Sequence, residues 1–226
     1  MRVVFILSSA ETLPPDRKIG CWLEELLAPY YLLLDHGAQI AIATPRGGAA
    51  PIDPVSVKAL QGAALMQRYR DDTELSERLQ NTMRIEQVSP SDFDAVIYPG
   101  GYSPMLDLRT DPASIDLISN MLHDDKLVGT ICHGAAVLLD VRGPQGHPLV
   151  RNRSLTSFTD SEEDAVGACD AVPYLVETEL RSQGAMFFAA PDWQKNVLVD
   201  GNLITGQNPA SALGVGEEII RLFRTK

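Results

Sequence analysis

The fold prediction starts from residues 126–140, KLVGTICHGAAVLLD. The apolar residues 127–131 predict a buried strand, Cys132-His133-Gly134 predicts a sharp turn, and the small residues from Ala135 onward predict the start of a helix. A nucleophile elbow has this order of elements, because the turn lifts the corner side chain clear of the sheet. The alternative is a structural cysteine at a strand end, since free cysteine is among the most buried residue types. This stretch alone does not decide between the two.

The helix expected after Cys132 also bears on the chemistry of its thiol. A helix N-terminus offers free backbone N–H groups and the positive end of the helix dipole. Such surroundings favour a thiolate over a thiol. We therefore expect the pKa of Cys132 to lie below the free value of about 8.5.

The size and composition of the chain favour one domain spanning residues 1–226, with 45% hydrophobic residues available for a core. The cysteines at positions 21, 132 and 169 are odd in number and lack metal-site spacing. They indicate neither a disulfide framework nor a metal centre. The net charge of −11 argues against a nucleic-acid partner, because binding to phosphates needs clustered Lys and Arg.

The hydropathy of the chain bears on its location. The apolar run at residues 3–7 is too short for the core of a signal peptide, and no stretch approaches membrane-spanning length. We therefore expect a reduced, cytoplasmic protein that does not associate with membranes.

Strand and helix signals alternate along the chain. Strands are expected at residues 3–7, 39–44, 93–98, 127–131, 154–158, 186–188, 197–199 and 203–205, with a hairpin joining the sixth and seventh. Helices are expected at residues 21–36, 55–80 (one or two), 114–122 and 172–183, and from residues 160 and 209 onward. Residues 8–18 are expected to form a loop. This alternation predicts an α/β fold with a mainly parallel central sheet.

Three turns follow strand ends, at Gly100-Gly101, Cys132-His133 and Thr159-Asp160. Ligands of open α/β sheets bind beyond the carboxyl ends of the strands, so these turns can build one site. The backbone N–H groups of Gly101 and His133 are candidates for an oxyanion hole. The glycine pair taken by itself favours a plain tight turn.

The expected helix at residues 21–36 carries an apolar stripe on which Glu25 falls, whereas Glu24 faces outward. The stripe consists of Trp22, Leu26, Pro29 and Leu33. A buried carboxyl is costly unless it is protonated or hydrogen-bonded. Pro29 cannot donate to the carbonyl of Glu25, so we expect a bent or unwound helix there. Glu25 is thus a functional candidate, and the alternative is a partly buried glutamate with a local donor.

One histidine stands apart from the others. His36, His123 and His147 are expected at the surface, near helix ends or in a Gly/Pro loop. His133 adjoins Cys132 and needs an acceptor to orient its ring, which Glu163 or Asp160 can supply. Cys–His–acid sites are recognised by roles rather than by chain order.

Six motifs spread over nearly the whole chain carry a family resemblance. They are GCWLEE at 20–25 with Pro29; ATPRGG at 43–48 followed by PIDP at 51–54; YPGG at 98–101; ICHG at 131–134; SFTD at 157–160 with Glu162-Glu163; and TGQNPAS at 205–211. With them the chain resembles the ThiJ/PfpI superfamily, whose flavodoxin-like three-layer sandwich is related to class I glutamine amidotransferases. It is most similar to the branch of heat-shock chaperones and class III glyoxalases.

The resemblance implies roles for four side chains. Cys132 is the nucleophile, Glu25 the acid hydrogen-bonded to it, His133 a second catalytic residue, and Glu163 the acid that orients His133. It also implies a homodimer. Residues 9–18 match the family pattern poorly, which leaves substrate selection open.

Three functions are compatible with these residues. The first is a glyoxalase of the class III type, a stress and detoxification enzyme that converts methylglyoxal to lactate through a Cys132 hemithioacetal. It would take a small aldehyde and need no cofactor and no metal. The second is an amidase or peptidase that uses Cys132, His133 and Glu163. The third is a stress chaperone whose cysteine senses oxidants.

Overall fold

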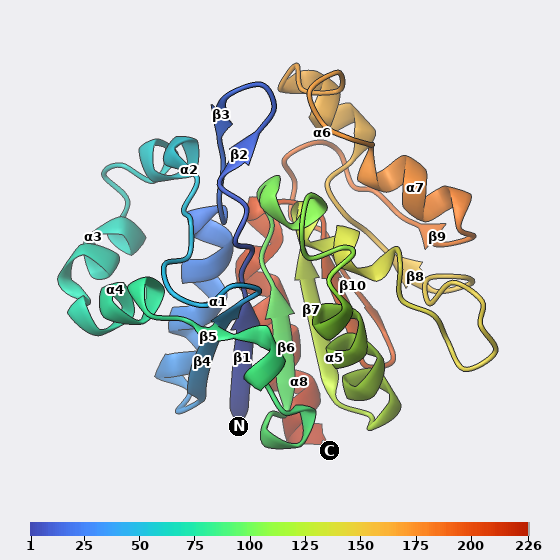
Figure 1. The fold of residues 1–226 in the computed structure, drawn as a ribbon, viewed down its shortest axis with the longest axis horizontal. Coiled ribbons are helices and arrows are strands. Elements are labelled where there is room, and N and C mark those ends of the chain that lie inside the picture. The colour runs from blue at the N-terminus through green and yellow to red at the C-terminus, as the bar shows by residue number, and fades with distance from the viewer. Residues whose placement is uncertain (226) are drawn as a thin grey trace.

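A seven-stranded sheet lies at the centre of the computed structural model, which describes residues 1–225 (Figure 1). Its order is β10-β11-β7-β6-β1-β4-β5, and only β10 runs antiparallel to its neighbour. The strands are β1 (Arg2–Ile6), β4 (Gln39–Thr44), β5 (Met83–Arg84), β6 (Ala95–Tyr98), β7 (Leu127–Ile131), β10 (Val197–Asp200) and β11 (Leu203–Gly206). The expected α/β fold with a mainly parallel sheet is confirmed.

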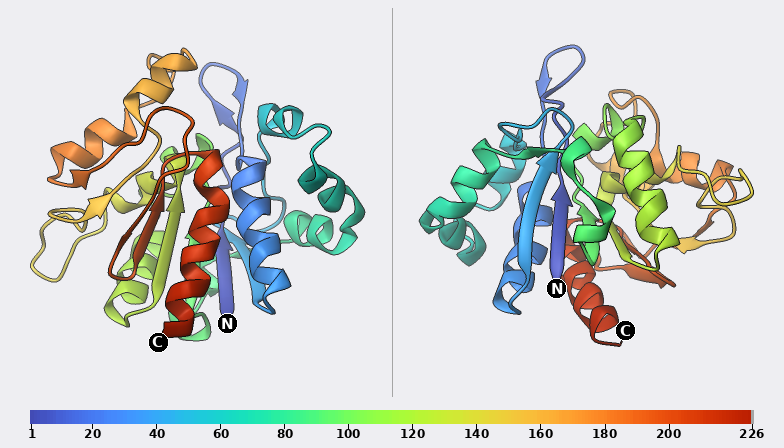
Figure 2. Two further views of the ribbon diagram at one scale, coloured as in Figure 1. Left: turned by 180° about the vertical axis from the view of Figure 1, so that it is seen from behind. Right: turned by 60° about the horizontal axis from the view of Figure 1, so that its bottom comes forward.

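Helices cover both faces of this sheet. α1 (Leu23–Asp35) and α8 (Ala212–Thr225) lie side by side on one face, and α5 (Pro112–His123) covers the other (Figures 1 and 2). Side chains of β1 alternate between the two cores: Val3 and Phe5 pack with α1 and α8, whereas Val4 and Ile6 face α5. Burial on both faces explains the unbroken apolar runs of the central strands.

Residues 54–80 form three short helices, α2 (Pro54–Ala59), α3 (Ala64–Asp71) and α4 (Thr73–Gln80), where the sequence suggested one or two. Two turns divide them. Gly62 adopts a positive φ of 82° after α2, and the Asp72 side chain caps α4 by accepting from the backbone N–H of Leu75. An aspartate at such a position begins a new helix more readily than it continues an old one.

The expected hairpin between residues 186–188 and 197–199 is wrong. β9 (Met186–Phe187) pairs instead with β8 (Ser154–Leu155) in a separate parallel ribbon, and the chain between the two strands forms α6 (Asp160–Ala165) and α7 (Val176–Ser182). β10 pairs with β11 across a tight turn containing Gly201, whose φ is +61°. A two-residue turn joins antiparallel strands more directly than the longer connection at residues 188–196.

Two segments expected as simple loop and helix differ in detail. Residues 8–18 contain a small hairpin of β2 (Thr12–Leu13) and β3 (Arg17–Lys18), which projects beyond the carboxyl end of β1 (Figure 1). The segment after β7 is a 3₁₀ helix, η4 (Cys132–Leu138), rather than an α-helix. Its residues are all buried and small or apolar apart from His133, so packing rather than helix propensity sets its tighter winding.

Further short 3₁₀ turns follow other strands and loops: η1 (Ile85–Gln87), η2 (Pro90–Asp92), η3 (Ser103–Met105) and η5 (Pro209–Ser211). Pro209 therefore begins η5, and α8 starts directly after it. No helix within residues 1–225 is both long enough and apolar enough to cross a bilayer.

Candidate active site

The backbone at Cys132 has the geometry of a nucleophile elbow. Its φ is +57°, in the left-handed region that few non-glycine residues adopt, directly after the fully buried strand β7. A side chain at Gly134 would place its Cβ only 2.2 Å from the carbonyl oxygen of Tyr98. Glycine is therefore required two residues after the cysteine, as the sequence pattern indicated.

A buried chain of hydrogen bonds leads away from the Cys132 thiol. Cys132 Sγ lies 3.2 Å from Nδ1 of His133, and Nε2 of the same ring lies 2.6 Å from Oε2 of Glu163. The hydroxyl of Tyr102 donates to the other carboxyl oxygen, Oε1, at 2.8 Å. The structure thus brings Cys132, His133 and Glu163 together as expected. Asp160, the alternative acceptor, instead accepts from the Thr178 hydroxyl.

The state of Glu163 determines where the proton sits on the His133 ring. Burial raises the pKa of Glu163, but hydrogen bonds from His133 and Tyr102 outweigh burial and hold it below its ordinary value. An ionised carboxylate can only accept, so Nε2 of His133 carries the hydrogen. In the neutral ring Nδ1 is then an acceptor directed at the thiol. The three side chains therefore have the arrangement of an acid–base relay.

Glu25 lies on the inner face of α1, fully buried, while Glu24 is partly exposed. Its Oε2 accepts from the backbone N–H of Gly100 at 2.7 Å. Burial raises the pKa of Glu25 to about 8, against the lowering effects of the Gly100 hydrogen bond and of Cys132. The carboxyl is therefore mostly protonated at neutral pH. Its inward orientation, read from the apolar stripe, is confirmed.

The second carboxyl oxygen of Glu25 is available for chemistry. The Cys132 thiol interacts with this carboxyl, yet within residues 1–225 Oε1 makes no hydrogen bond of standard distance and angle. A buried oxygen without a partner is costly, and such groups concentrate at functional sites. A bent or unwound helix was expected at Pro29; α1 continues through this residue, so the helix is not unwound there. Gly216 of α8 packs directly against Pro29 and supports the helix there.

The expectation of a lowered Cys132 pKa is also wrong. Burial and the charge of Glu25 raise this pKa, and the backbone N–H of His133 offsets only part of the effect. Cys132 is buried, with 4% of the residue exposed, and no α-helix begins behind it. Cys132 is thus a thiol at rest, and a base must remove its proton. Nδ1 of His133 is placed to do so.

A cavity of about 270 Å³ opens over the thiol. Cys132 and His133 both line it, together with the aromatic residues Trp22, Tyr102, Phe158 and Trp193. The lining residues are Arg17, Trp22, Val55, Gly101, Tyr102, Cys132, His133, Phe158, Val166, Trp193 and Pro209. Gly101, with φ of +87°, and His133 both lie at the cavity, and their pairing as an oxyanion hole stays a prediction.

Sequence reasoning missed Glu162, which fixes one wall of this cavity. It is fully buried and accepts from Asn208 Nδ2 at 2.7 Å, from the backbone N–H of Trp193 at 2.8 Å and from that of Thr159 at 3.1 Å. Trp193 is held with a φ of +64°. Thr159 caps the helix α6, and the T-x-x-E capping box at 159–162 is the signal that could have identified Glu162.

Tyr102 and Arg17 were missed as well. Tyr102 supports Glu163, and the Arg17 guanidinium lies over the Tyr102 ring with Cζ 4.6 Å from its centroid. Neither residue belongs to a pattern that sequence alone ties to the cysteine.

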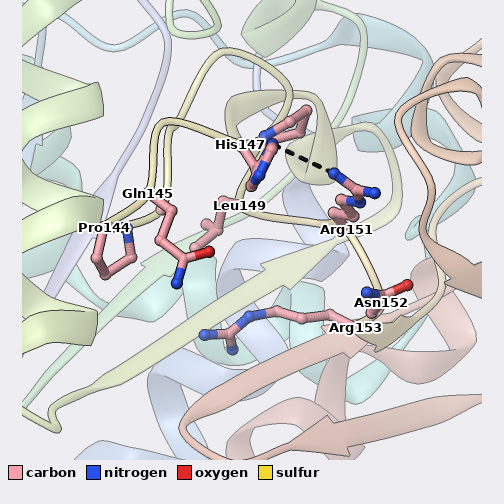
Figure 3. Close-up of a pocket in the computed structure, with 9 residues that line it drawn as sticks. Pro144, Gln145, His147, Leu149, Arg151, Asn152 and Arg153 are labelled. Carbon is pink, nitrogen blue, oxygen red and sulfur yellow. Dashed lines mark hydrogen bonds between the residues drawn. The ribbon is translucent and has the colours of Figure 1, made fainter.

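A larger cavity, of about 540 Å³, lies elsewhere, in the loop at residues 143–153 (Figure 3). It is lined by His147, Arg151 and Arg153 among others and contains neither a cysteine nor a carboxylate. It therefore lacks the groups needed for the thiol chemistry considered above. In the described chain, residues 1–225, no group of three or more His, Cys, Asp or Glu side chains is arranged to hold a metal ion.

The fold and the elbow define a class of α/β proteins with a cysteine at the corner of a central strand and an acid from the first helix. The chain belongs to the DJ-1/PfpI family, whose model matches residues 23–222. It is 26% identical to glyoxalase 3 of Candida albicans over 99% of this chain and 98% of that protein. It is also 26% identical to the glutathione-independent glyoxalase hsp3101 of Schizosaccharomyces pombe, over 94% and 91%.

Among solved structures, the 24 kDa rapid encystment protein of Francisella tularensis superimposes with a TM-score of 0.93 and 32% identity, covering 97% of each chain. More distant relatives include the deglycase PfpI of Pyrococcus furiosus, at 22% identity over 88% of this chain and 92% of that protein.

Proposed function

We propose that this protein is a glutathione-independent glyoxalase that converts α-oxoaldehydes, with methylglyoxal as the simplest, to 2-hydroxy acids. The observation that carries the proposal is the buried Glu25 carboxyl, with a pKa of about 8, beside the Cys132 thiol. A thiol hydrolase needs the Cys–His–acid relay but no second acid at the sulfur. An internal redox isomerisation needs a group that removes a proton from one carbon and returns it to the next.

The first step is addition of sulfur to the aldehyde. Nδ1 of His133 takes the thiol proton as the Cys132 sulfur attacks C1 of the substrate, and the aldehyde oxygen receives the displaced electron pair. The backbone N–H groups of Gly101 and His133 are the proposed donors to this oxygen. Glu163, held by Tyr102, stabilises the imidazolium that forms. Protonation of the oxygen gives a hemithioacetal.

Isomerisation and hydrolysis follow. The ionised form of Glu25 removes the C1 proton, the electron pair forms the C1=C2 bond, and the C2 oxygen is protonated. Glu25 returns a proton to C2 as C1 becomes the carbonyl of a thioester. Water, deprotonated by His133, attacks C1, and the C–S bond breaks to release the 2-hydroxy acid and the thiolate. C1 is oxidised and C2 reduced, so no external oxidant enters.

A cysteine hydrolase is the second candidate, because the Cys132–His133–Glu163 relay is complete for acyl transfer. It differs from the glyoxalase in its use of Glu25. An amidase or peptidase would lose little from Glu25→Gln, whereas the isomerisation would lose its proton carrier.

The test measures lactate directly, because methylglyoxal also disappears by forming adducts with Lys and Arg. Protein treated with EDTA and freed of small thiols is supplied with methylglyoxal, and lactate is quantified by chromatography. We expect lactate from wild type and from Cys169→Ser, and none from Cys132→Ala. Absence of lactate together with cleavage of an amide or ester by Cys132 would favour the hydrolase. Absence of both, with accumulation of a Cys132 sulfinate under peroxide, would favour a redox-sensing chaperone.

A further inference from the structure

Arg17 is the single Lys or Arg among the described residues that line the cavity above Cys132, and no carboxylate lines it. Its guanidinium lies over the ring of Tyr102, which in turn packs against the His133 ring at a centroid distance of 4.7 Å. One aromatic ring therefore separates this positive charge from the acid–base relay.

The charge on Arg17 is not neutralised by a fixed partner. In the part of the chain that the structure describes, Arg17 has a cation–π contact with Tyr102 but no ion pair. The positive charge of Arg17 is one of the causes that lower the pKa of Glu163. It acts in the same direction on Asp53, where burial outweighs it and the pKa is raised. An unpaired guanidinium at the edge of an apolar cavity is suited to bind an anionic group of a ligand.

The cavity is also larger than methylglyoxal requires. Methylglyoxal has five non-hydrogen atoms, whereas about 270 Å³ corresponds to the share of liquid volume of roughly nine water molecules. The walls beyond the thiol are apolar, formed by Trp22, Phe158 and Trp193. Val55 and Trp193 stay about half exposed at 48% and 49%. This space fits a short apolar chain attached to the reacting aldehyde.

We infer that the site selects α-oxoaldehydes whose apolar chain ends in a carboxylate, and that Arg17 is the specificity-determining residue that binds this carboxylate. The inference rests on the proposed glyoxalase function. A suitable probe is 4,5-dioxopentanoate, which with one water gives 2-hydroxypentanedioate. The aldehyde carbon is oxidised to a carboxylate, the neighbouring ketone carbon is reduced to an alcohol, and the remote carboxylate is unchanged.

The experiment compares 4,5-dioxopentanoate with its neutral methyl ester, and includes methylglyoxal as the parent substrate. The readout is the ratio of kcat/KM for the carboxylate to kcat/KM for the ester, from direct assay of each 2-hydroxy acid. We expect a ratio of about three to ten in the wild type, because Arg17 is exposed and water partly screens its charge-assisted hydrogen bond to the carboxylate. The preference should lie in KM and should decrease with added salt.

Variants on the hairpin assign the effect to one side chain. Arg17→Gln should bring the ratio to about one, and Arg17→Glu should reverse it. Lys18→Gln is the matched control, because Lys18 adjoins Arg17 on β3 and is exposed like it but does not line the cavity. It should keep the wild-type ratio.

Two results overturn the inference, and they are distinguishable. The role of Arg17 is refuted, while the glyoxalase function stands, if all three substrates are turned over and the wild-type ratio is near one. The same holds if the wild-type ratio persists in Arg17→Gln and Arg17→Glu. Failure of every substrate to give a 2-hydroxy acid refutes the glyoxalase function and the inference together.

Discussion

The backbone N–H of Gly100 donates to the carboxyl of Glu25 across 2.7 Å, although 75 residues separate the two. This hydrogen bond joins the turn after β6 to the first turn of α1 and holds an acid in the core beside a thiol. Without such a donor the buried carboxyl would be still more costly. The pKa of about 8 is the balance between burial and this contact.

The raised pKa of Glu25 predicts an unusual effect of pH on stability. Between the ordinary value of 4.5 and about 8, the folded protein holds a proton on Glu25 that the unfolded chain has released. Stability then falls as pH rises, by up to about 1.4 kcal/mol per pH unit from this group. Glu25→Gln keeps a carbonyl acceptor for Gly100 and removes the slope. Urea unfolding of both proteins at several pH values between 5 and 8 measures the difference. Parallel stability curves would contradict the buried, protonated state.

The same substitution separates stability from activity. Glu25→Gln should lower lactate formation at least about tenfold, because acid–base groups contribute about 10²–10⁴ in rate. Glu24→Gln is the matched control and should retain activity, since the neighbouring carboxyl is partly exposed. Equal losses in the two variants would show that the inner face of α1 is misassigned.

Glu163→Gln should disable the relay through the tautomer of His133. The amide nitrogen of Gln can donate to Nε2, which leaves the hydrogen on Nδ1 where it faces the thiol. Turnover should fall by about 10²–10⁴, the usual contribution of general acid–base catalysis, whose upper end matches the cost of a wrong histidine tautomer in a serine-protease triad. Tyr102→Phe removes one hydrogen bond to the carboxylate but leaves the tautomer in place, so its loss should be smaller. The measurement is the steady-state kcat of the two variants at pH 7. Equal rates would contradict the assignment of the hydrogen to Nε2 of His133.

Cys132 should be the first cysteine to react with limiting iodoacetamide near pH 7. It opens into the cavity and has Nδ1 of His133 as a base, whereas Cys21 is buried with its pKa raised by burial and by Glu25. Cys169 is more accessible, and its pKa is raised like that of Cys132, but among the described residues no histidine is hydrogen-bonded to it, so the base beside Cys132 makes the difference. Peptide mapping locates the label, with Cys169→Ser as the control for accessibility. Label appearing first at Cys21 or Cys169 would refute the assignment of the reactive thiol.

Glu162→Ala should destabilise the fold and loosen the cavity wall. The substitution removes the acceptor of Asn208 and of the Trp193 backbone, and each unsatisfied buried group costs about 1–3 kcal/mol. Urea unfolding measures the loss, and KM for methylglyoxal should rise because Trp193 is no longer fixed. Glu74→Ala, on the exposed face of α4, should change stability by no more than about 0.5 kcal/mol. Similar effects of the two substitutions would mean that Glu162 does not position the wall.

Local patterns were sufficient to predict the elbow and the inward face of α1. The strand, turn and glycine around Cys132 are contiguous, and the position of Glu25 follows from helical periodicity alone. Glu163 was named with Asp160 as an alternative, because a helix start near a strand end limits the candidates to adjacent carboxyls. The hydrogen bond at 2.6 Å resolves the choice.

What sequence did not predict depends on surroundings assembled from distant segments. The direction of the Cys132 pKa shift follows from burial and from the charge of Glu25, and neither can be read from residues 126–140. β9 pairs with β8, a strand about 30 residues earlier in the chain, and not with the nearby β10. Arg17 lies at the site because residues 12–18 form a hairpin. The hydroxyl of Tyr102 donates a hydrogen bond to Glu163, which lies 61 residues later in the chain.

The contact between α1 and α8 has a consequence for folding during synthesis on the ribosome. α8 follows every other described element, and Gly216 packs on Pro29 one turn beyond Glu25. Because N-terminal segments emerge first, α1 is made early and lacks its cover until α8 has left the ribosome. The inner face of α1, on which Glu25 lies, therefore completes its packing only after α8 has been made, so a chain truncated before α8 would carry Cys132 beside an incompletely covered α1.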